Sequence, residues 1–191
     1  MNVFRVNFMK TKRKDVLLEC RNLLMGTAEF LEFKVPESWN VGPIPFETDV
    51  EHWAEINGKT WVTRGQTQIC IILGEKRGRI NLLVKARGYN KKLDVENWLR
   101  KKRESIERKK GKRVRKAGFL TVNGHKLPYI IYSRIRKKFG FFGKISEETF
   151  LNAILNCDET SRTIFLDARL DFDDDSVIER LLDVLSTFTC H

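Results

Sequence analysis

The chain has 191 residues, of which 41% are hydrophobic and 32% are charged, and its formal net charge is +11 at pH 7. This apolar content excludes a disordered chain, and the length suits one domain with a sizeable core. No stretch approaches the roughly 18 consecutive apolar residues that a membrane-spanning helix needs.

The first residues and the charge distribution predict a location and a class of partner. Residues 1–5 lack the apolar segment of a signal peptide, so we expect a cytoplasmic protein. Positive charge is concentrated in residues 94–116, whereas residues 156–191 are acidic. A basic region of this kind favours anionic partners, either nucleic acid or an acidic protein surface. The alternative is the charge-rich surface of a thermophile protein, in which opposite charges pair with one another.

The cysteines indicate no common metal or redox motif. Cys20, Cys70, Cys157 and Cys190 are widely spaced, and no two of them form a Cys-x-x-Cys pair. We therefore expect reduced and mostly buried thiols, with a Cys157–Cys190 disulfide as the alternative.

The first elements are predicted from short patterns. In residues 15–26 the apolar residues recur at a helical spacing, Asp15 can cap the start and Gly26 can end it, which predicts a short helix. A strand is the alternative because the segment is short. Residues 29–35 are typical of a strand that Pro36 ends.

Two strand pairs are predicted next, after a loop over residues 41–45 that holds two prolines and a glycine. Asn57-Gly58 indicates a type I′ turn in the first pair, because both central positions need positive φ. The second pair flanks a Gly-x-x-x-Gly loop that lacks the Lys-Ser/Thr ending of a phosphate-binding loop. The two pairs are residues 53–56 with 59–63, and residues 67–73 with 79–87.

The second half of the chain has the clearest pattern. Asp94 begins an amphipathic helix that Gly111 ends, and residues 176–179 (Ser-Val-Ile-Glu) form a capping box for a second helix reaching about Phe188. Two amphipathic helices cannot bury their apolar faces alone. We therefore predict a single α+β domain, an α/β/α sandwich with a central twisted antiparallel sheet of about six or seven strands and flanking helices. Between the helices, strands of a meander are predicted at about 113–122, 125–137, 147–157 and 162–170.

Three segments resemble PsbP-like proteins. The segment from Phe30 to Trp39 resembles their opening, in which a strand is followed by a proline and, three residues later, a tryptophan. Residues 122–132 (Val-Asn-Gly-His and then Tyr-x-x-Tyr) and the final helix with Leu185, Ser186 and Phe188 are also similar. The related Ran-binding Mog proteins share the α/β/α sandwich. The resemblance covers roughly residues 29–39 and 79–188, and it implies a core of residues 29–191 after an extension of residues 1–28.

This resemblance also implies a function class. Known members are chiefly binding or assembly factors, which implies a protein that is not an enzyme. The chain departs from PsbP members in lacking a transit peptide, which argues against a photosystem role. Its heavily basic helix is a second departure, so no family binding site is carried over by position.

The densest charge lies between Arg100 and Lys116, where eleven basic residues accompany only Glu104 and Glu107. Several of these cations stand four residues from one of the two glutamates, which explains part of the charge as a solvated helix surface. The basic residues beyond the helix end exceed what the helix dipole accommodates. They predict an anion-binding site, with a merely solvated patch as the alternative. They are Lys109, Lys110, Lys112, Arg113, Arg115 and Lys116.

Two predicted strands carry further basic residues. In residues 127–138, alternation places Tyr132, Arg134, Arg136 and Lys138 on one face. If the strand at residues 79–87 is a neighbour, its own basic face extends this one into a stripe. The alternative is that the long side chains cover apolar sheet surface with their stems.

Aromatic residues follow the second basic set. Phe141 and Phe142, in the turn over residues 139–143, are candidates for base stacking or for insertion into a protein partner. The alternative is that these phenylalanines pack against the edge of the core.

Neither catalysis nor metal binding is indicated by spacing. Cys157, Cys190, His125 and His191 are residue types that bind zinc, but they match no zinc motif. No candidate nucleophile lies in a catalytic motif, and the acidic residues 171–175 are explained by the N-terminus of the last helix. We predict no catalytic residue, no metal and no cofactor.

We therefore predict a non-enzymatic binding or assembly protein that docks an acidic protein surface or nucleic acid through a basic helix end and the adjoining strand. The alternatives are a nucleic-acid-binding protein proper, or a small-molecule-binding module with a pocket between helix and sheet. The predicted partner-binding residues are Arg100, Lys101, Lys109, Lys110, Lys112, Arg113, Arg115, Lys116, Arg134, Arg136, Lys138, Phe141 and Phe142.

Overall fold

The computed structural model describes residues 12–22, 26–43, 50–56, 59–64, 68–74, 79–88, 92–137, 145–170 and 174–190. Within these residues the strands form two sheets, which confirms the predicted α+β class. The small sheet has the strand order β2 (Gly26–Pro36), β1 (Arg13–Asn22), β5 (Lys59–Arg64), β4 (Val50–Ile56). The large sheet has the strand order β3 (Asn40–Pro43), β6 (Gln68–Gly74), β7 (Arg79–Gly88), β11 (Arg162–Leu170), β10 (Ile145–Cys157), β9 (His125–Lys137), β8 (Lys112–Val122).

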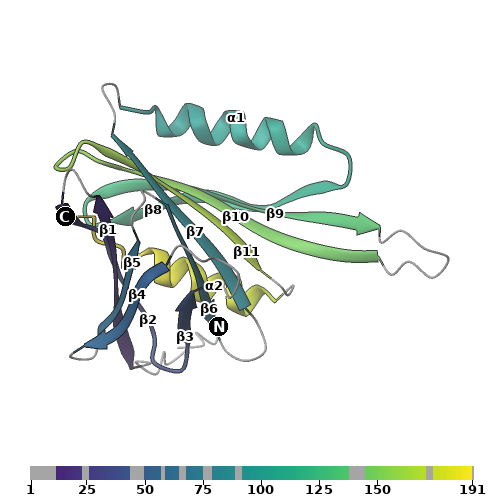
Figure 1. Ribbon diagram of the computed structural model, residues 1–191. Helices are drawn as coiled ribbons and strands as arrows, with labels where there is room; N and C mark the ends of the chain where they lie inside the picture. Colours follow the sequence, from purple (N-terminus) through teal and green to yellow (C-terminus); the bar gives the residue numbers. More distant parts are fainter. Residues whose placement is uncertain are drawn as a thin grey trace, which may run out of the picture.

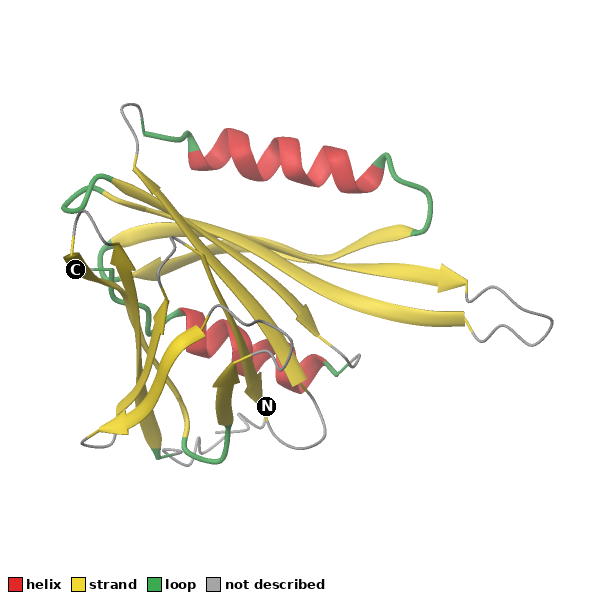
Figure 2. Cartoon of the chain, in the orientation of Figure 1, coloured by secondary structure: helices red, strands yellow, loops and turns green. Residues whose placement is uncertain are grey.

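The helices α1 (Val95–Glu107) and α2 (Asp175–Leu185) lie on opposite faces of the large sheet, and the small sheet lies on the α2 side (Figures 1 and 2). Successive side chains of β9 point to opposite faces of the large sheet. Tyr129 and Ile131 belong to the main core with α2, whereas the equally buried Ile130 lies outside that cluster. Each face of the large sheet is therefore covered by a different helix.

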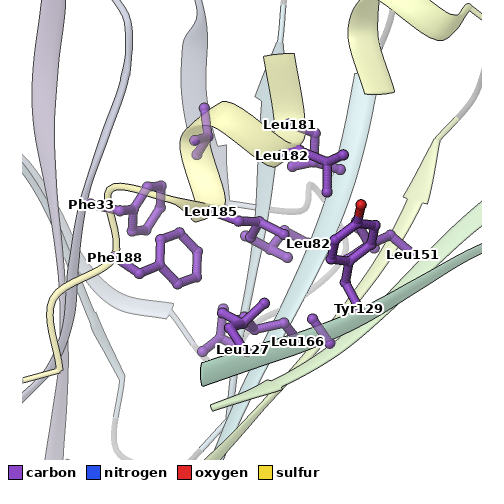
Figure 3. Packing of buried hydrophobic residues seen from close by; sticks show 14 of the residues in the cluster. Phe33, Leu82, Leu127, Tyr129, Leu151, Leu166, Leu181, Leu182, Leu185 and Phe188 are labelled. Carbon is purple, nitrogen blue, oxygen red and sulfur yellow. The ribbon is translucent and has the colours of Figure 1, made fainter. Parts of the chain in front are cut away.

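The main core fills the space between the large sheet, α2 and the small sheet (Figure 3). Leu181 and Leu185 of α2 are fully buried against strands of the large sheet. Phe188, which follows α2, packs on Phe33 of β2 with ring centroids 4.9 Å apart. The end of the chain thus joins the two sheets.

The helix predicted over residues 15–26 is wrong, and the strand alternative is confirmed by β1. β1 lies between β2 and β5 and pairs with both, so it has no open edge. Val16 and Leu17 are adjacent in sequence and both are buried. A strand covered on both faces carries consecutive apolar residues, and in a short segment these resemble a helical pattern.

The loop predicted over residues 41–45 is also partly wrong, because Asn40–Pro43 forms β3 and pairs with β6. β3 is at the end of the sheet within the described residues, where a proline is tolerated. The other early predictions hold. The strand over 29–35 lies within β2, β4 pairs with β5, and β6 pairs with β7. The turns 57–58 and 75–78 lie outside the described residues.

The meander and the first helix are confirmed. β8, β9, β10 and β11 are neighbours in chain order, and Asn123 and Gly124 of the first turn have φ of 46° and 78°. The Asp94 side chain accepts a hydrogen bond from the Asn97 backbone N–H at 2.9 Å, which caps α1. Gly111 has φ of 80° in the turn that leads from α1 to β8. Among the described residues, no helix combines the length and the apolar character that crossing a bilayer requires.

The last helix is confirmed, but its predicted capping box is wrong. Asp174, not Ser176, is the N-cap, and its carboxylate accepts a hydrogen bond from the Ser176 backbone N–H at 2.8 Å. Glu179 points to β8 instead of back to the helix start, because it pairs with Lys116 at 2.5 Å. An earlier aspartate with suitable backbone geometry takes the cap when the predicted partner is engaged elsewhere.

The Asp174 cap predicts a pH dependence of stability. Hydrogen bonds from Ser176 lower the pKa of Asp174. A lowered folded-state pKa stabilises the protein above the unfolded pKa, and this contribution is lost as the pH falls. We expect wild type to be more stable than Asp174→Asn at pH 7, and the difference to shrink below about pH 4. Urea unfolding of both proteins from pH 7 to pH 3 measures it. A difference that is constant over this range contradicts the assignment.

Candidate functional site

A bulge in β8 decides which cations face α1. The β8–β9 register begins at Val122–His125 and shifts between Val114 and Lys116, so that Arg115 is the extra residue. Compared with an uninterrupted strand that starts from the Val122–His125 pair, such an insertion moves the side chains of residues 112–114 to the other face of the sheet. As a result Lys112 stands opposite Arg134 on the α1 side.

Four basic residues from four parts of the chain gather on this side. Lys102 of α1, Lys109 after α1, Lys112 of β8 and Arg134 of β9 form what we call the cationic cluster. Burial, followed by the positive charges of Lys109, Arg134 and Lys102, lowers the pKa of Lys112. In the described part of the chain, no carboxylate forms an ion pair with any member of this cluster.

An aromatic pair lies below the cationic cluster. The Lys112 ammonium is 5.0 Å from the centroid of the Tyr132 ring. Tyr132 stacks on Phe150 of β10, with centroids 5.3 Å apart. Burial is the main cause that raises the pKa of the Tyr132 hydroxyl, and the Arg134 charge opposes it. Tyr132 thus remains neutral and supports Lys112 from below.

A groove of about 580 Å³ runs along the outer side of β8 next to the cationic cluster. Arg103 and Glu107 of α1 line one side, and residues 112–117 of β8 line the other. The groove therefore extends along six consecutive residues of β8.

Three predicted site residues lie on the opposite face, toward α2. Arg115 pairs with Asp175 at 2.6 Å, and Lys116 pairs with Glu179 at 2.5 Å. The Glu179 hydrogen bond is the main cause that raises the pKa of Lys116. Arg113 is exposed and lines a second groove of about 570 Å³ on this face. The acidic helix α2 therefore neutralises part of the basic strand.

The predicted residues of α1 are only partly available. Arg100 pairs with Glu104 at 3.0 Å and donates to the Asn97 side chain at 2.8 Å, which confirms that this surface carries i,i+4 ion pairs. Lys101 is exposed and lies near the exposed Leu93, while Lys110 is exposed in the turn after the helix. The charge of Arg100 is therefore paired within α1. Lys101 and Lys110 each stand next to a member of the cationic cluster in the sequence.

The predicted stripe between two strands is not formed. β10 and β11 lie between β9 and β7, so the basic residues of residues 79–87 are three strands away from those of β9. Arg136 lies in β9 opposite Ser146. Lys138, Phe141 and Phe142 lie outside the described residues.

Lys102 was missing from the predicted site, although the helix period contains the signal. Trp98, Lys102, Ile106 and Lys109 follow one another at intervals of four, four and three residues, so they share one side of the helix. Ile106 on that side is buried against the sheet. Cations that share a helix side with the buried residue must lie close to the sheet.

The comparisons with known proteins show a likeness in fold and none in sequence. No protein-family model matches the chain, and no curated protein matches its sequence. The fold is similar to the solution structure of cyanobacterial PsbP (CyanoP) from Synechocystis sp. PCC 6803, with a TM-score of 0.48 and 10% identity over 100% of this chain and 98% of that one. This likeness concerns the fold alone. It is too distant to transfer a binding residue or an activity.

Proposed function

We propose that the chain is a non-enzymatic binding or assembly protein that docks an acidic protein segment on the cationic cluster and along the adjoining groove of β8. The observation that supports this proposal most is the convergence of Lys102, Lys109, Lys112 and Arg134 without an ion-paired carboxylate in the described part of the chain. We further infer an α/β/α sandwich as the platform and a cytoplasmic location.

The fold holds the four cations of the cationic cluster together against their mutual repulsion. Like charges held together by a fold repel one another, and the pKa of Lys112 is lowered by burial first and by this repulsion second. An anionic partner relieves the repulsion when it binds. It is also attracted from a distance, which raises the association rate.

The shape of the site favours an acidic protein segment over nucleic acid. The groove follows one strand, and the ring next to the cationic cluster is already covered. Lys112 of β8 lies over the Tyr132 ring, and Phe150 of the neighbouring strand β10 stacks on the same ring. Non-specific binding of single-stranded nucleic acid relies on aromatic faces that bases can stack on.

The test compares charge removal inside and outside the cationic cluster. We expect Lys109→Gln/Lys112→Gln to weaken binding of an oligoglutamate peptide about tenfold at low salt, because two attractive charges are lost. Lys12→Gln/Lys34→Gln removes the same charge from exposed positions on the small-sheet side and is expected to change the affinity less than about twofold. Fluorescence anisotropy with a labelled peptide measures both.

Two results would change the proposal. If wild type does not bind the peptide at low salt, or if both double variants lose the same affinity, docking at the cationic cluster is wrong. If an oligonucleotide of equal charge binds more tightly than the peptide, with an affinity that falls steeply with salt, the partner is nucleic acid.

A further inference from the structure

Three potential metal ligands that are far apart in the sequence meet at one end of the large sheet. The ligand atoms of His125, Cys157 and Cys190 all lie within 4.8 Å of one another. The β9–β10 register explains the first two. The paired register ends with Tyr129 opposite Ala153. His125 lies four residues before Tyr129 and Cys157 four residues after Ala153, so alternation directs both side chains to the same face at this end of the sheet.

The third ligand is positioned by the end of the chain. Thr189 pairs with Glu32 of β2 through two backbone hydrogen bonds of 2.7 and 2.9 Å. This pairing fixes the next residue, Cys190, beside β10, where the Cys157 sulfur lies 3.8 Å from the Cys190 carbonyl oxygen. Both cysteines are buried, and neither is part of a disulfide.

A carboxylate completes a set of four donors. Glu159, in the turn after β10, places its Oε2 3.2 Å from His125 Nε2 and 3.6 Å from the Cys157 sulfur. Glu159 is about half exposed, whereas the His125 side chain is 12% exposed. Cys157 and Cys190 are thus buried, His125 is largely covered, and Glu159 lies toward solvent.

We propose that this site binds one Zn²⁺ ion through the sulfurs of Cys157 and Cys190, a ring nitrogen of His125 and a carboxylate oxygen of Glu159. Two sulfurs, one nitrogen and one oxygen are a donor set that zinc accepts. Zinc–sulfur bonds of about 2.3 Å and zinc–nitrogen bonds of about 2.0 Å put tetrahedral ligands roughly 3.5–3.8 Å apart. The ligand atoms of His125, Cys157 and Cys190, which lie within 4.8 Å of one another, need to approach by only about 1 Å at most.

The ion would have a structural role. It would connect the start of β9, the end of β10 and the residue that follows the β2 pairing, three parts of the chain that are far apart in the sequence. With four protein ligands the zinc has no open position for a substrate. This inference is independent of the proposed anion docking, since none of the ligands belongs to the cationic cluster.

The experiment uses the full chain, purified under reducing conditions without chelators. We expect near-stoichiometric zinc by elemental analysis of wild type and of Cys70→Ser, and less than about a tenth of that in Cys190→Ser and His125→Gln. After the metal is removed by a chelator, Co²⁺ is the spectroscopic probe. It should give the charge-transfer bands of cobalt–thiolate bonds and the intense visible bands of tetrahedral geometry in wild type.

Two further measurements make the outcome decisive. Glu159→Gln changes a half-exposed side chain, and so it should fold; we expect it to weaken Co²⁺ binding about tenfold or more while the thiolate bands remain. Circular dichroism identifies any ligand variant that has lost its fold. If reduced, folded wild type contains no zinc and binds neither Zn²⁺ nor Co²⁺, or if mass spectrometry of the native protein shows a Cys157–Cys190 disulfide, the zinc site is wrong.

Discussion

Replacing Phe188 by alanine is expected to destabilise the protein by about 3–5 kcal/mol, which is the usual cost of removing a fully buried aromatic side chain. Phe188 is 1% exposed and belongs to the main core. Its ring packs on Phe33, so the deletion leaves a cavity where the end of the chain joins the small sheet. Urea unfolding followed by circular dichroism measures the loss.

Phe119 provides the matched control for this prediction. It is 41% exposed, and its ring lies 4.2 Å below the Lys126 ammonium. We expect Phe119→Ala to cost less than about 1 kcal/mol, since an exposed cation–π contact is weak. A loss below about 1 kcal/mol for Phe188→Ala would mean that the C-terminal segment does not pack in the core as described.

The second large effect is expected at Asn156, on the face of the sheet below α1. Asn156 is 3% exposed, donates to the Leu93 carbonyl at 2.7 Å and accepts from the Thr163 hydroxyl at 2.9 Å. Asn156→Ala leaves the buried Thr163 hydroxyl and the part-buried Leu93 carbonyl without this hydrogen bond. We expect a loss of about 3 kcal/mol, because each unsatisfied buried group costs about 1–3 kcal/mol.

The same substitution should also loosen the segment before α1, because Asn156 connects Leu93 to the sheet. Hydrogen exchange at the first turn of α1 is expected to be faster in the variant.

Two control variants test the stability effect. Thr163→Val removes only the hydrogen bond between Thr163 and Asn156 and should cost about 1 kcal/mol. Asn97→Ala on α1 should cost less than about 0.5 kcal/mol. An effect of Asn156→Ala that does not exceed that of Asn97→Ala would contradict this account.

Local signals were sufficient to predict α1, α2 and the meander. Asn123-Gly124 defines a turn by itself, since both residues adopt positive φ. Asp94 begins α1 as predicted because a cap depends only on neighbouring residues. The N-cap of α2 was predicted at Ser176 and is Asp174, only two residues earlier.

The small sheet required information that is not local. β1 pairs in parallel with β5, about forty residues later, and no turn sequence encodes such a pairing. Burial of both faces of β1 also removed the alternation that distinguishes a strand from a helix. Val16 and Leu17 are both buried for this reason.

The candidate site depended on one extra residue. The Asn123-Gly124 turn alone would place Arg113 opposite Arg134, whereas the bulge at Arg115 places Lys112 there. This shift divides the basic residues of β8 between α1 and α2. A bulge has no reliable sequence signature, so the residue types of the site were predictable and their division between the faces was not. Similarly, the spacing of His125, Cys157 and Cys190 gave no sign that strand pairing brings them together.

The position of β8 has a consequence for self-association. Within the described residues β8 is the last strand of the large sheet, and an open strand of this length is a template for pairing with another molecule. Lysine side chains and a local irregularity are common means of preventing such pairing, and β8 has both. The positive charge that would attract an acidic partner is therefore also expected to disfavour pairing of β8 with a second copy of the chain. A ligand that neutralised this charge and left the β8 backbone exposed would favour strand pairing between molecules. A partner that binds here without promoting aggregation must therefore also cover the β8 backbone.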